Sequence, residues 1–402
     1  MPNAYILAFK DRYFIIICPF SRYLVSHPGE FCWIIRGLLF RQFIGNHMTN
    51  PVFLSQFLAD EHTQIRYFDM GRRVSKIRPA DFEKFEQGNM AYPYPYQQTA
   101  WFGILFWNTK NKDQHNIWFL RMPLDERGHI NLASRDEFMD MLLSRIGERI
   151  SSKQKGEDAL SHALKDNPYV FKPTEENMSF FNAKAKQAMG YPASAFLTDI
   201  IQYLNEENYE NWQQLGLQGF ADLAVRQNKP EVSRLIIKAL PHLPEQPFCA
   251  LCNALENEPC NAELSQSIQL QITQLLNKND ETQETINKLN SAIRALANTA
   301  AKQIKIHCIE QVLKSHLSTQ PSILVMLAAK NWEALDDEKL LKLYLEQLAQ
   351  NTNGQELFNA LISDQMFMPG KRNTILAIFR DPDRSETLSK AVGGFFQHIN
   401  QA

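Results

Sequence analysis

Glycine is absent from the whole stretch between Phe220 and Asn353. This residue supplies the left-handed and tight-turn backbone of phosphate loops, nucleophile elbows and hairpins. Apolar residues recur in the same stretch at helical spacing, interrupted mainly by Pro, Asn and Asp. The missing glycine therefore argues against nucleotide chemistry in this half of the chain and favours stacked helices.

Long apolar runs, a disulfide framework and a strong net charge are also missing. No stretch of about 18 apolar residues occurs, so the sequence predicts no membrane-spanning helix. With only 6 cysteines in 402 residues, we expect a reducing compartment and a cytoplasmic protein. The formal net charge of -2 provides no global positive field for nonspecific binding to nucleic acid or anionic membranes. The length allows two or three domains.

Sequence signatures of catalysis and of metal binding are lacking. None of the motifs G-x-S-x-G, G-x-x-x-x-G-K-[ST], G-x-G-x-x-G and H-E-x-x-H occurs. Cys249, Cys252 and Cys260 lack the second tight pair typical of zinc sites, and their helical spacing favours core packing. The sequence predicts no catalytic residue, no cofactor and no metal. Many active sites leave no linear trace, so enzymatic activity stays open but is disfavoured.

Residues 1–47 differ in composition from the rest, with many aromatic residues and an excess of Lys and Arg over acids. At Met48 the pattern changes, because Asn50 can cap a helix that has Pro51 at its first position. We expect this helix to span Val52–Glu61. We also expect Met48 to be the true start, with residues 1–47 arising from a misassigned upstream start codon. The alternative is a genuine N-terminal arm.

Residues 48–150 predict a small α+β domain. A capping box from Ser134 to Glu137 predicts a helix that continues to about Ile150. A second helix is expected from Pro79 to Gly88. The polar loop Asn108–His115 joins two apolar strands in a hairpin. The expected strands are Gln64–Met70, Arg72–Ile77, Thr99–Trp107 and Ile117–Met122. Together these elements predict an antiparallel sheet with flanking helices.

Residues 151–402 predict an all-α helical-repeat domain of HEAT-like type. Amphipathic helices are expected from Glu175–Met189 to the C-terminus. The segment Asn211–Leu215 is echoed by Asn331–Leu335, and Ala254–Asn257 by Ala295–Asn298. Both offsets fit a period of about 40 residues, which is typical of paired-helix solenoids.

Charged and aromatic residues are concentrated between Tyr67 and Phe138. Aromatic rings beside arginines on a sheet can stack bases and bind phosphates. Alternatively, the tryptophans are core, since both faces of Thr99–Trp107 are apolar. The extended segment Tyr92–Tyr96 is either a clamp across the domain or a recognition strip. The candidate binding residues are Arg66, Asp69, Arg72, Arg73, Tyr92, Tyr94 and Tyr96.

The chain resembles an uncharacterised bacterial domain-of-unknown-function family. The residues that carry the resemblance are Asp69–Val74, Tyr92–Gln98, Ala100–Trp107, Ile117–Gly128 and Arg135–Phe138. The resemblance runs from Met48 to near the C-terminus and leaves out the first 47 residues. It implies no known activity and adds no catalytic residue.

Three functions follow, in order of preference. The first is a non-enzymatic adaptor whose helical repeat binds a protein partner. The second is an RNA- or ribosome-associated factor that uses the arginine and tyrosine residues of the α+β domain. The third is an enzyme with an unrecognised active site between the domains. The identity of the partner and the oligomeric state cannot be read from the sequence.

Overall fold

The computed structural model describes residues 8–9, 12–13, 53–151, 164 and 166–401. Met48, Asn50 and Pro51, on which the expected start and the first helix cap depend, lie outside the described residues. The strands β1 (Ala8–Phe9) and β2 (Arg12–Tyr13) form a short antiparallel pair.

The main sheet has four antiparallel strands in the order β4-β3-β5-β6. Its strands are β3 (Thr63–Asp69), β4 (Ser75–Ile77), β5 (Thr99–Asn108) and β6 (Asn111–Pro123). In register, Phe68 lies opposite Gly103, which lies opposite Phe119 on the next strand. Residues 102–107 of β5 are all buried. This confirms the prediction that β5 is covered on both faces.

Four predicted boundaries in this region are wrong. The helix expected to run to Glu61 ends at Leu58, because the backbone of Ala59 is extended. The strand expected over Arg72–Ile77 begins only at Ser75, because residues 71–74 form a turn. The hairpin loop expected over Asn108–His115 is short, since β5 and β6 extend to Asn108 and Asn111, with a register shift between Trp107 and Asn108. Asn131 replaces the predicted capping box at Ser134: its side chain accepts from the Ser134 N–H at 3.1 Å.

Three helices cover one face of the sheet and form, with it, the head of the molecule. These are α2 (Leu54–Leu58), α3 (Pro79–Glu86) and α4 (Leu132–Ser151). Phe82 of α3 stacks on Tyr67 of β3 with ring centroids 3.9 Å apart. Phe138 and Leu142 of α4 are fully buried in the same cluster. The head therefore has its own apolar core on this side of the sheet.

The remaining helices form the body. They are α6 (Glu175–Met189), α7 (Phe196–Glu206), α8 (Leu217–Ala224), α9 (Pro230–Ala239), α10 (Glu245–Leu255), α11 (Ala262–Asn277), α12 (Gln283–Ala295), α13 (Lys302–Leu313), α14 (Pro321–Lys330), α15 (Glu338–Ala349), α16 (Gly354–Phe367), α17 (Lys371–Phe379) and α18 (Glu386–Gln401), with short 3-10 helices η1 (Leu240–His242) and η2 (Ala334–Asp336). These bounds agree to within a few residues with the helices that apolar spacing predicts at Glu175–Met189, Ser194–Leu204 and near 217–227, 230–240, 246–256, 262–276, 281–297, 300–316, 321–330, 336–349, 354–363, 370–379 and 384–399. Within the described ranges, no helix combines the length and apolar character needed to cross a bilayer.

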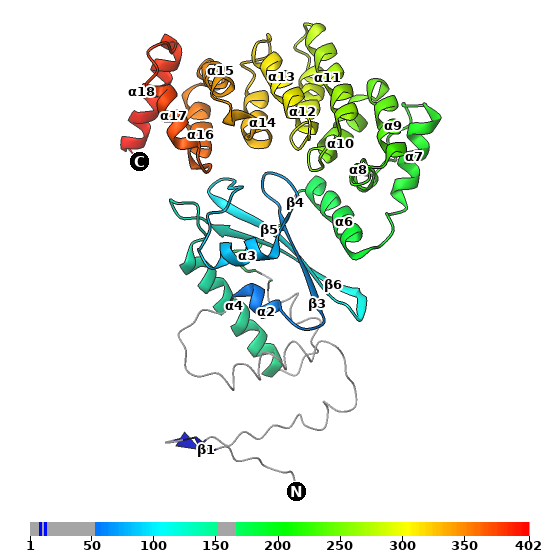
Figure 1. The fold of residues 1–402 in the computed structure, drawn as a ribbon, viewed down its shortest axis with the longest axis vertical. Helices are drawn as coiled ribbons and strands as arrows, with labels where there is room; N and C mark the ends of the chain where they lie inside the picture. The colour runs from blue at the N-terminus through cyan, green and yellow to red at the C-terminus, as the bar shows by residue number, and fades with distance from the viewer. Residues whose placement is uncertain (1–7, 10–11, 14–52, 152–163, 165, 402) are drawn as a thin grey trace.

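The body helices are arranged in two layers. Each even-numbered helix from α6 to α16 contacts the next even-numbered one, and the odd-numbered helices from α7 to α17 contact one another in the same way. Figure 1 shows the row they make, with the even-numbered layer toward the sheet. The echo between Ala254–Asn257 and Ala295–Asn298 falls on equivalent ends of α10 and α12. The other echo joins non-equivalent connections, α7–α8 and α14–α15, which run between the layers in opposite directions.

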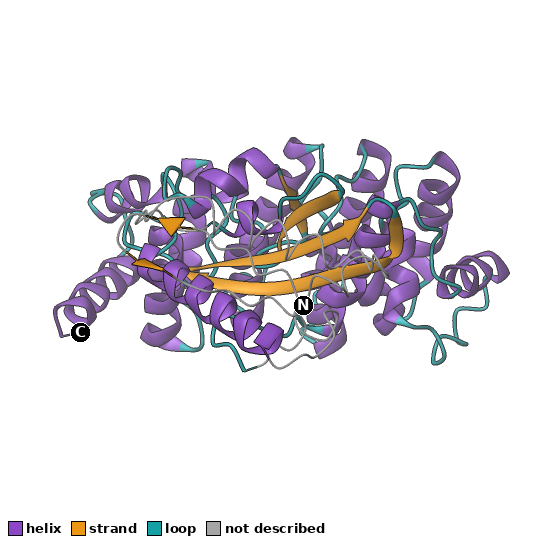
Figure 2. Ribbon diagram, turned by 90° about the horizontal axis from the view of Figure 1, so that it is seen from below, coloured by secondary structure: helices purple, strands orange, loops and turns teal. Residues whose placement is uncertain are grey.

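The second face of the sheet belongs to the core of the body. Phe68, Leu105 and Trp107 join the same apolar cluster as α6 and the helices beyond it. Phe68 packs edge-on against Phe181 of α6, with centroids 5.1 Å apart. At Gly103 a Cβ would lie 2.8 Å from the Phe181 ring. Figure 2 shows the sheet lying along the row of helices, with α4 on its other side. The described elements on either side of the predicted boundary at 150/151 are therefore joined by a continuous core.

Candidate binding site

The turn between β3 and β4, residues Gly71–Val74, is here named the Arg–Arg turn. Asp69, at the end of β3, determines its shape: one carboxylate oxygen accepts from the Gly71 N–H at 3.1 Å and the other from the Arg73 N–H at 3.4 Å. The Tyr92 hydroxyl donates to the same carboxylate at 2.5 Å. An aspartate that binds the backbone N–H two residues ahead favours a turn over a strand. This local bond is why Arg72 and Arg73 leave the sheet.

Arg72 inserts between the head and the body. Its side chain has no exposed surface, and its guanidinium donates to the Pro95 carbonyl at 2.7 Å, to the Ala328 carbonyl at 3.1 Å and to the Asp364 carboxylate at 2.7 Å. It also lies 5.4 Å from the ring centroid of Trp332. One side chain thus joins the head to both α14 and α16. A buried charge with this number of partners is costly to leave unpaired.

Arg73 binds the next part of the body. Its guanidinium lies 4.1 Å from the Trp332 ring centroid, forms an ion pair with Glu333 at 2.8 Å, and donates to the Asn298 side-chain carbonyl at 3.1 Å. Lys305 of α13 shares Glu333 at 3.3 Å. Stacking on an aromatic ring together with a carboxylate partner is an arrangement that arginine favours and lysine does not.

Amide side chains at successive helix ends form a ladder along the even-numbered layer. The Asn298 amide donates to the Asn257 carbonyl at 3.2 Å, Asn331 donates to a carbonyl of α12 at 3.2 Å, and Gln365 donates to a carbonyl of α14 at 3.1 Å. The Val74 N–H donates to the side chain of Asn257 at 2.7 Å. The Arg–Arg turn therefore contacts the ladder at α10, α12 and α14, through main-chain and side-chain groups alike.

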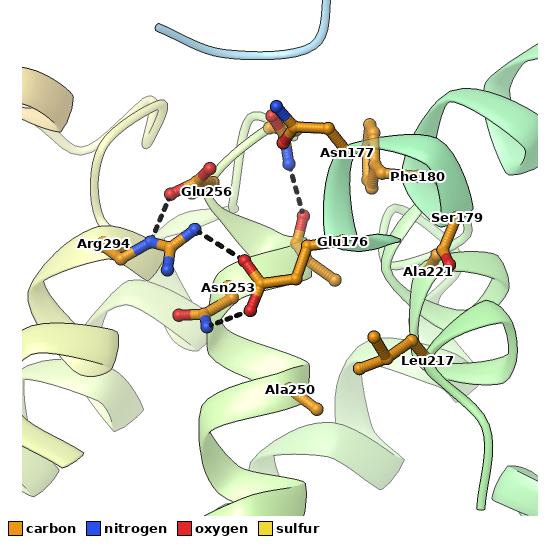
Figure 3. Close-up of a pocket in the computed structure, with 12 residues that line it drawn as sticks. Glu176, Asn177, Ser179, Phe180, Leu217, Ala221, Ala250, Asn253, Glu256 and Arg294 are labelled. Carbon is orange, nitrogen blue, oxygen red and sulfur yellow. Dashed lines mark hydrogen bonds and ion pairs between the residues drawn. The ribbon is translucent and has the colours of Figure 1, made fainter. Parts of the chain in front are cut away.

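The buried carboxylate of Glu256 binds two basic side chains of the even-numbered layer next to the Arg–Arg turn. Its side chain accepts from Arg294 at 2.6 Å and from Lys330 at 3.0 Å. Lys330 in turn donates to the Arg72 carbonyl at 2.8 Å. Figure 3 shows Arg294 between Glu256 and Glu176 of α6. Burial alone would raise the pKa of Glu256, but Lys330 and Arg294 outweigh it and hold the pKa below its ordinary value.

The cavity beside this network is small. It has a volume of about 20 Å³ and lies among α6, α8, α10 and α12. Asn253 donates to Glu176 at 3.0 Å at its edge, and the side-chain oxygen of Asn253 has no partner there. The volume is enough for about one water molecule. The cavity therefore has room for one water molecule and none for a larger ligand.

The contacts between the Arg–Arg turn and the body are here called the junction. Two titratable groups at the junction have pKa values shifted mainly by burial. Burial raises the pKa of Asp69 to about 6, although hydrogen bonds from Tyr92 and Gly71 oppose the shift. Burial also lowers the pKa of Lys371, while the nearby Asp336 carboxylate, 3.1 Å away, opposes this change. Both shifts follow from the burial of these groups.

The residues predicted to bind a ligand fall into two groups. Asp69, Arg72, Arg73 and Tyr92 are buried at or near the junction. The partly exposed members are Arg66, Tyr94 and Tyr96. Arg66 lies apart on β3, 5.2 Å from the centroid of Trp107. An RNA-binding surface composed of all these residues would require the Arg–Arg turn to leave the body, and RNA binding stays a prediction.

The tyrosine segment contacts the body at the same place as the turn. Tyr94 packs edge-on against Trp332 with centroids 6.5 Å apart, and Tyr96 lies 5.8 Å from the Arg72 guanidinium. Tyr92 is fully buried beneath them. These contacts favour the clamp over the recognition strip.

Sequence reasoning missed the residues of the body that receive the turn. Trp332 was part of an echo that turned out to be structurally non-equivalent, and Asp364 lay in no motif. Asn257 and Asn298 are the last residues of the echoed segments Ala254–Asn257 and Ala295–Asn298, which occupy equivalent helix ends. Their repetition was the one signal in the sequence that pointed to the residues that receive the turn.

The cysteines and other metal-ligating residues form no cluster in the part of the chain that the structure covers. Cys252 and Cys260 are buried and Cys249 is partly exposed, and all are free thiols. Burial raises the pKa of Cys260 to about 12. Across the described ranges, no group of three or more His, Cys, Asp or Glu side chains is placed to hold a metal ion.

Comparison with known proteins gives one match. A family model described as a protein of unknown function, DUF3549, matches residues 52–396. The matched range includes the head and the body as far as Phe396 in α18. No curated protein and no solved structure matches the chain.

Proposed function

We propose that this chain, which belongs to the DUF3549 family of proteins of unknown function, is a non-enzymatic adaptor whose helical body binds polypeptide. The observation that supports this best is that the body already binds one peptide segment of its own chain. The Arg–Arg turn is held through Asn257, Asn298, the Ala328 carbonyl and Asp364. A surface that binds both main chain and side chains in cis has the chemistry needed to bind a partner in trans.

The layered arrangement of the body supports the same proposal. We infer that it is a HEAT-like solenoid, since paired helices stack in sequence order and repeat an amide at their ends. Solenoids of this kind present extended surfaces that bind other proteins. The free thiols among the described residues suit a cytoplasmic location.

The surface left for a partner begins next to the Arg–Arg turn. Val325 of α14 is 39 % exposed and lies four residues before Ala329, whose carbonyl accepts from Arg72 at 3.4 Å. Residues at this spacing share one face of a helix. Leu270 of α11, in the other layer, is 61 % exposed. These two exposed apolar side chains therefore provide one position for a probe in each layer of helices.

Site-specific photocrosslinking tests the proposal. A photoreactive amino acid is placed at Val325 in one full-length variant and at Leu270 in the other. Each variant is then irradiated inside cells of the organism that makes the protein. We expect the Val325 probe to capture a defined protein that the Leu270 probe does not. The captured protein is then purified, and its affinity is measured for the unmodified chain and for the variants Val325→Glu and Leu270→Glu.

The adaptor proposal is supported if only Val325→Glu weakens this binding. It fails if the Val325 probe captures no more protein than a sample kept in the dark, or if both layers capture the same proteins equally. Recovery of crosslinked RNA in place of protein would favour the RNA-associated alternative.

A further inference from the structure

A second and larger cavity, here named the junction pocket, lies between the head and the end of the body. Its volume is about 340 Å³, which falls within the range of small-molecule sites, roughly 300–1,000 Å³. The head contributes the turn Glu126–Gly128, and the body contributes α16, α18 and the start of α17. The apolar part of its lining consists of Met366, Phe367, Met368, Pro369, Phe395 and Ile399.

Two arginines line the pocket, one from each part of the molecule. Arg127 comes from the head and Arg372 from the first turn of α17. In the part of the chain that the structure describes, neither guanidinium has an ion-pair or hydrogen-bond partner. By contrast, both arginines of the Arg–Arg turn have an ion-pair partner in the body. Both arginines are exposed, so the pocket carries at its surface two guanidinium groups that no carboxylate of the described residues pairs with.

The charge of the lining indicates what kind of anion fits. Glu126 is the carboxylate of the lining, so the excess over Arg127 and Arg372 is one positive charge. A carboxylate neutralises that excess, whereas a doubly charged phosphate would overcompensate it. The planar guanidinium also matches a carboxylate through two parallel hydrogen bonds.

We propose that the junction pocket binds a small amphipathic carboxylate. The apolar chain or ring of the ligand lies against the walls made by α16 and α18, and its carboxylate lies between Arg127 and Arg372. Ile399, which is 49 % exposed, becomes covered. Because the walls come from both head and body, the ligand bridges them and stabilises the folded chain by mass action. This site is separate from the surface proposed for a protein partner.

The probe for the test is decanoate, titrated into the purified full-length chain by calorimetry and by thermal unfolding. 1-Decanol has the same chain without the charge, and acetate has the charge without the chain. We expect saturable binding of one decanoate, a rise in the unfolding midpoint, and at least tenfold weaker binding of both comparison compounds.

Variants assign the binding to the pocket. Arg372→Gln is expected to weaken decanoate binding about tenfold or more, as for loss of a charge-assisted hydrogen bond. Arg127→Gln is the second variant, on the other wall and in another element. Arg380→Gln, which removes an exposed arginine of the body outside the lining, is the matched control and should leave binding unchanged.

Several results would overturn the assignment. These are no saturable binding of decanoate, equal affinity for 1-decanol, or equal binding by the Arg372→Gln, Arg127→Gln and Arg380→Gln variants. N-acetyl-Ala-Ala-Phe presents the same chemistry as the C-terminal end of a polypeptide. If this tripeptide binds more tightly than decanoate, the pocket takes a protein end and the small-molecule assignment is wrong.

Discussion

Replacing Arg72 by alanine is expected to lower the free energy of unfolding by about 3 kcal/mol. Removing one partner of a buried ion pair typically costs about 3–5 kcal/mol. The Arg72 side chain is 0 % exposed and Asp364 is 20 % exposed, so the stranded carboxylate keeps some contact with water and the lower end applies. The Pro95 and Ala328 carbonyls also lose their donor.

Urea unfolding followed by circular dichroism and by tryptophan fluorescence measures the loss. With a denaturant slope of about 3 kcal/mol per molar, the midpoint should fall by roughly 1 M. The two signals should also cease to coincide, because the variant removes a connection between two parts that otherwise unfold together.

Arg66→Ala is the matched control on the same sheet. Arg66 is partly exposed, donates to the Ile65 carbonyl at 2.8 Å and lies over Trp107. Its loss should cost no more than about 1 kcal/mol. A double-mutant cycle of Arg72→Ala with Asp364→Ala should give a coupling energy of about 0.5–3 kcal/mol. If Arg72→Ala lowers the free energy of unfolding no more than Arg66→Ala does, or if the coupling energy between Arg72 and Asp364 is zero, Arg72 does not hold the head and the body together.

Three further changes test the same junction. Asn257→Ala leaves the buried Val74 N–H without an acceptor and should cost about 1–3 kcal/mol in urea unfolding; a cost below 0.5 kcal/mol would contradict the ladder. Asp69 has its pKa raised to about 6 in the folded chain, so its contribution to stability is present at low pH and is lost as pH rises through about 6. Lowering the pH from 7 to 5 should therefore stabilise the natural chain relative to Asp69→Asn, by on the order of 1 kcal/mol, and an equal pH response of the two would refute the assignment. Gly103→Ala places a Cβ 2.8 Å from Phe181 and should lower the thermal midpoint, at a cost of about 1–3 kcal/mol; an unchanged midpoint would show that the sheet and α6 pack less closely.

Much of the body could be predicted because its signals are local. The helix α6 was expected over Glu175–Met189 and is found there, with Thr174 accepting from the Asn177 N–H at its start. Pro321 similarly marks the first turn of α14. Capping residues, prolines and apolar spacing all lie within the helix that they define, so one sequence was enough.

The junction could not be predicted because its partners are distant in the chain. Arg72 and Asp364 are separated by 292 positions, and nothing local marks the Ala328 carbonyl as an acceptor. The alternating residues after Gly71 satisfied a strand pattern, but the carboxylate of Asp69 and the contacts with the body turn the chain out of the sheet. Composition identified the arginines as unusual without showing that they are buried.

The distance between Arg72 and its partners has a consequence for synthesis on the ribosome. Asp364 is added 292 residues after Arg72, which at about 5–20 residues per second takes roughly 15–60 s. During that interval the head can complete its core against α4, but the opposite face of the sheet, with Leu105 and Trp107, has not yet met all of its covering helices. Part of this apolar face of the nascent head thus stays uncovered for many seconds, and docking is complete only after α14 and α16 have been synthesised.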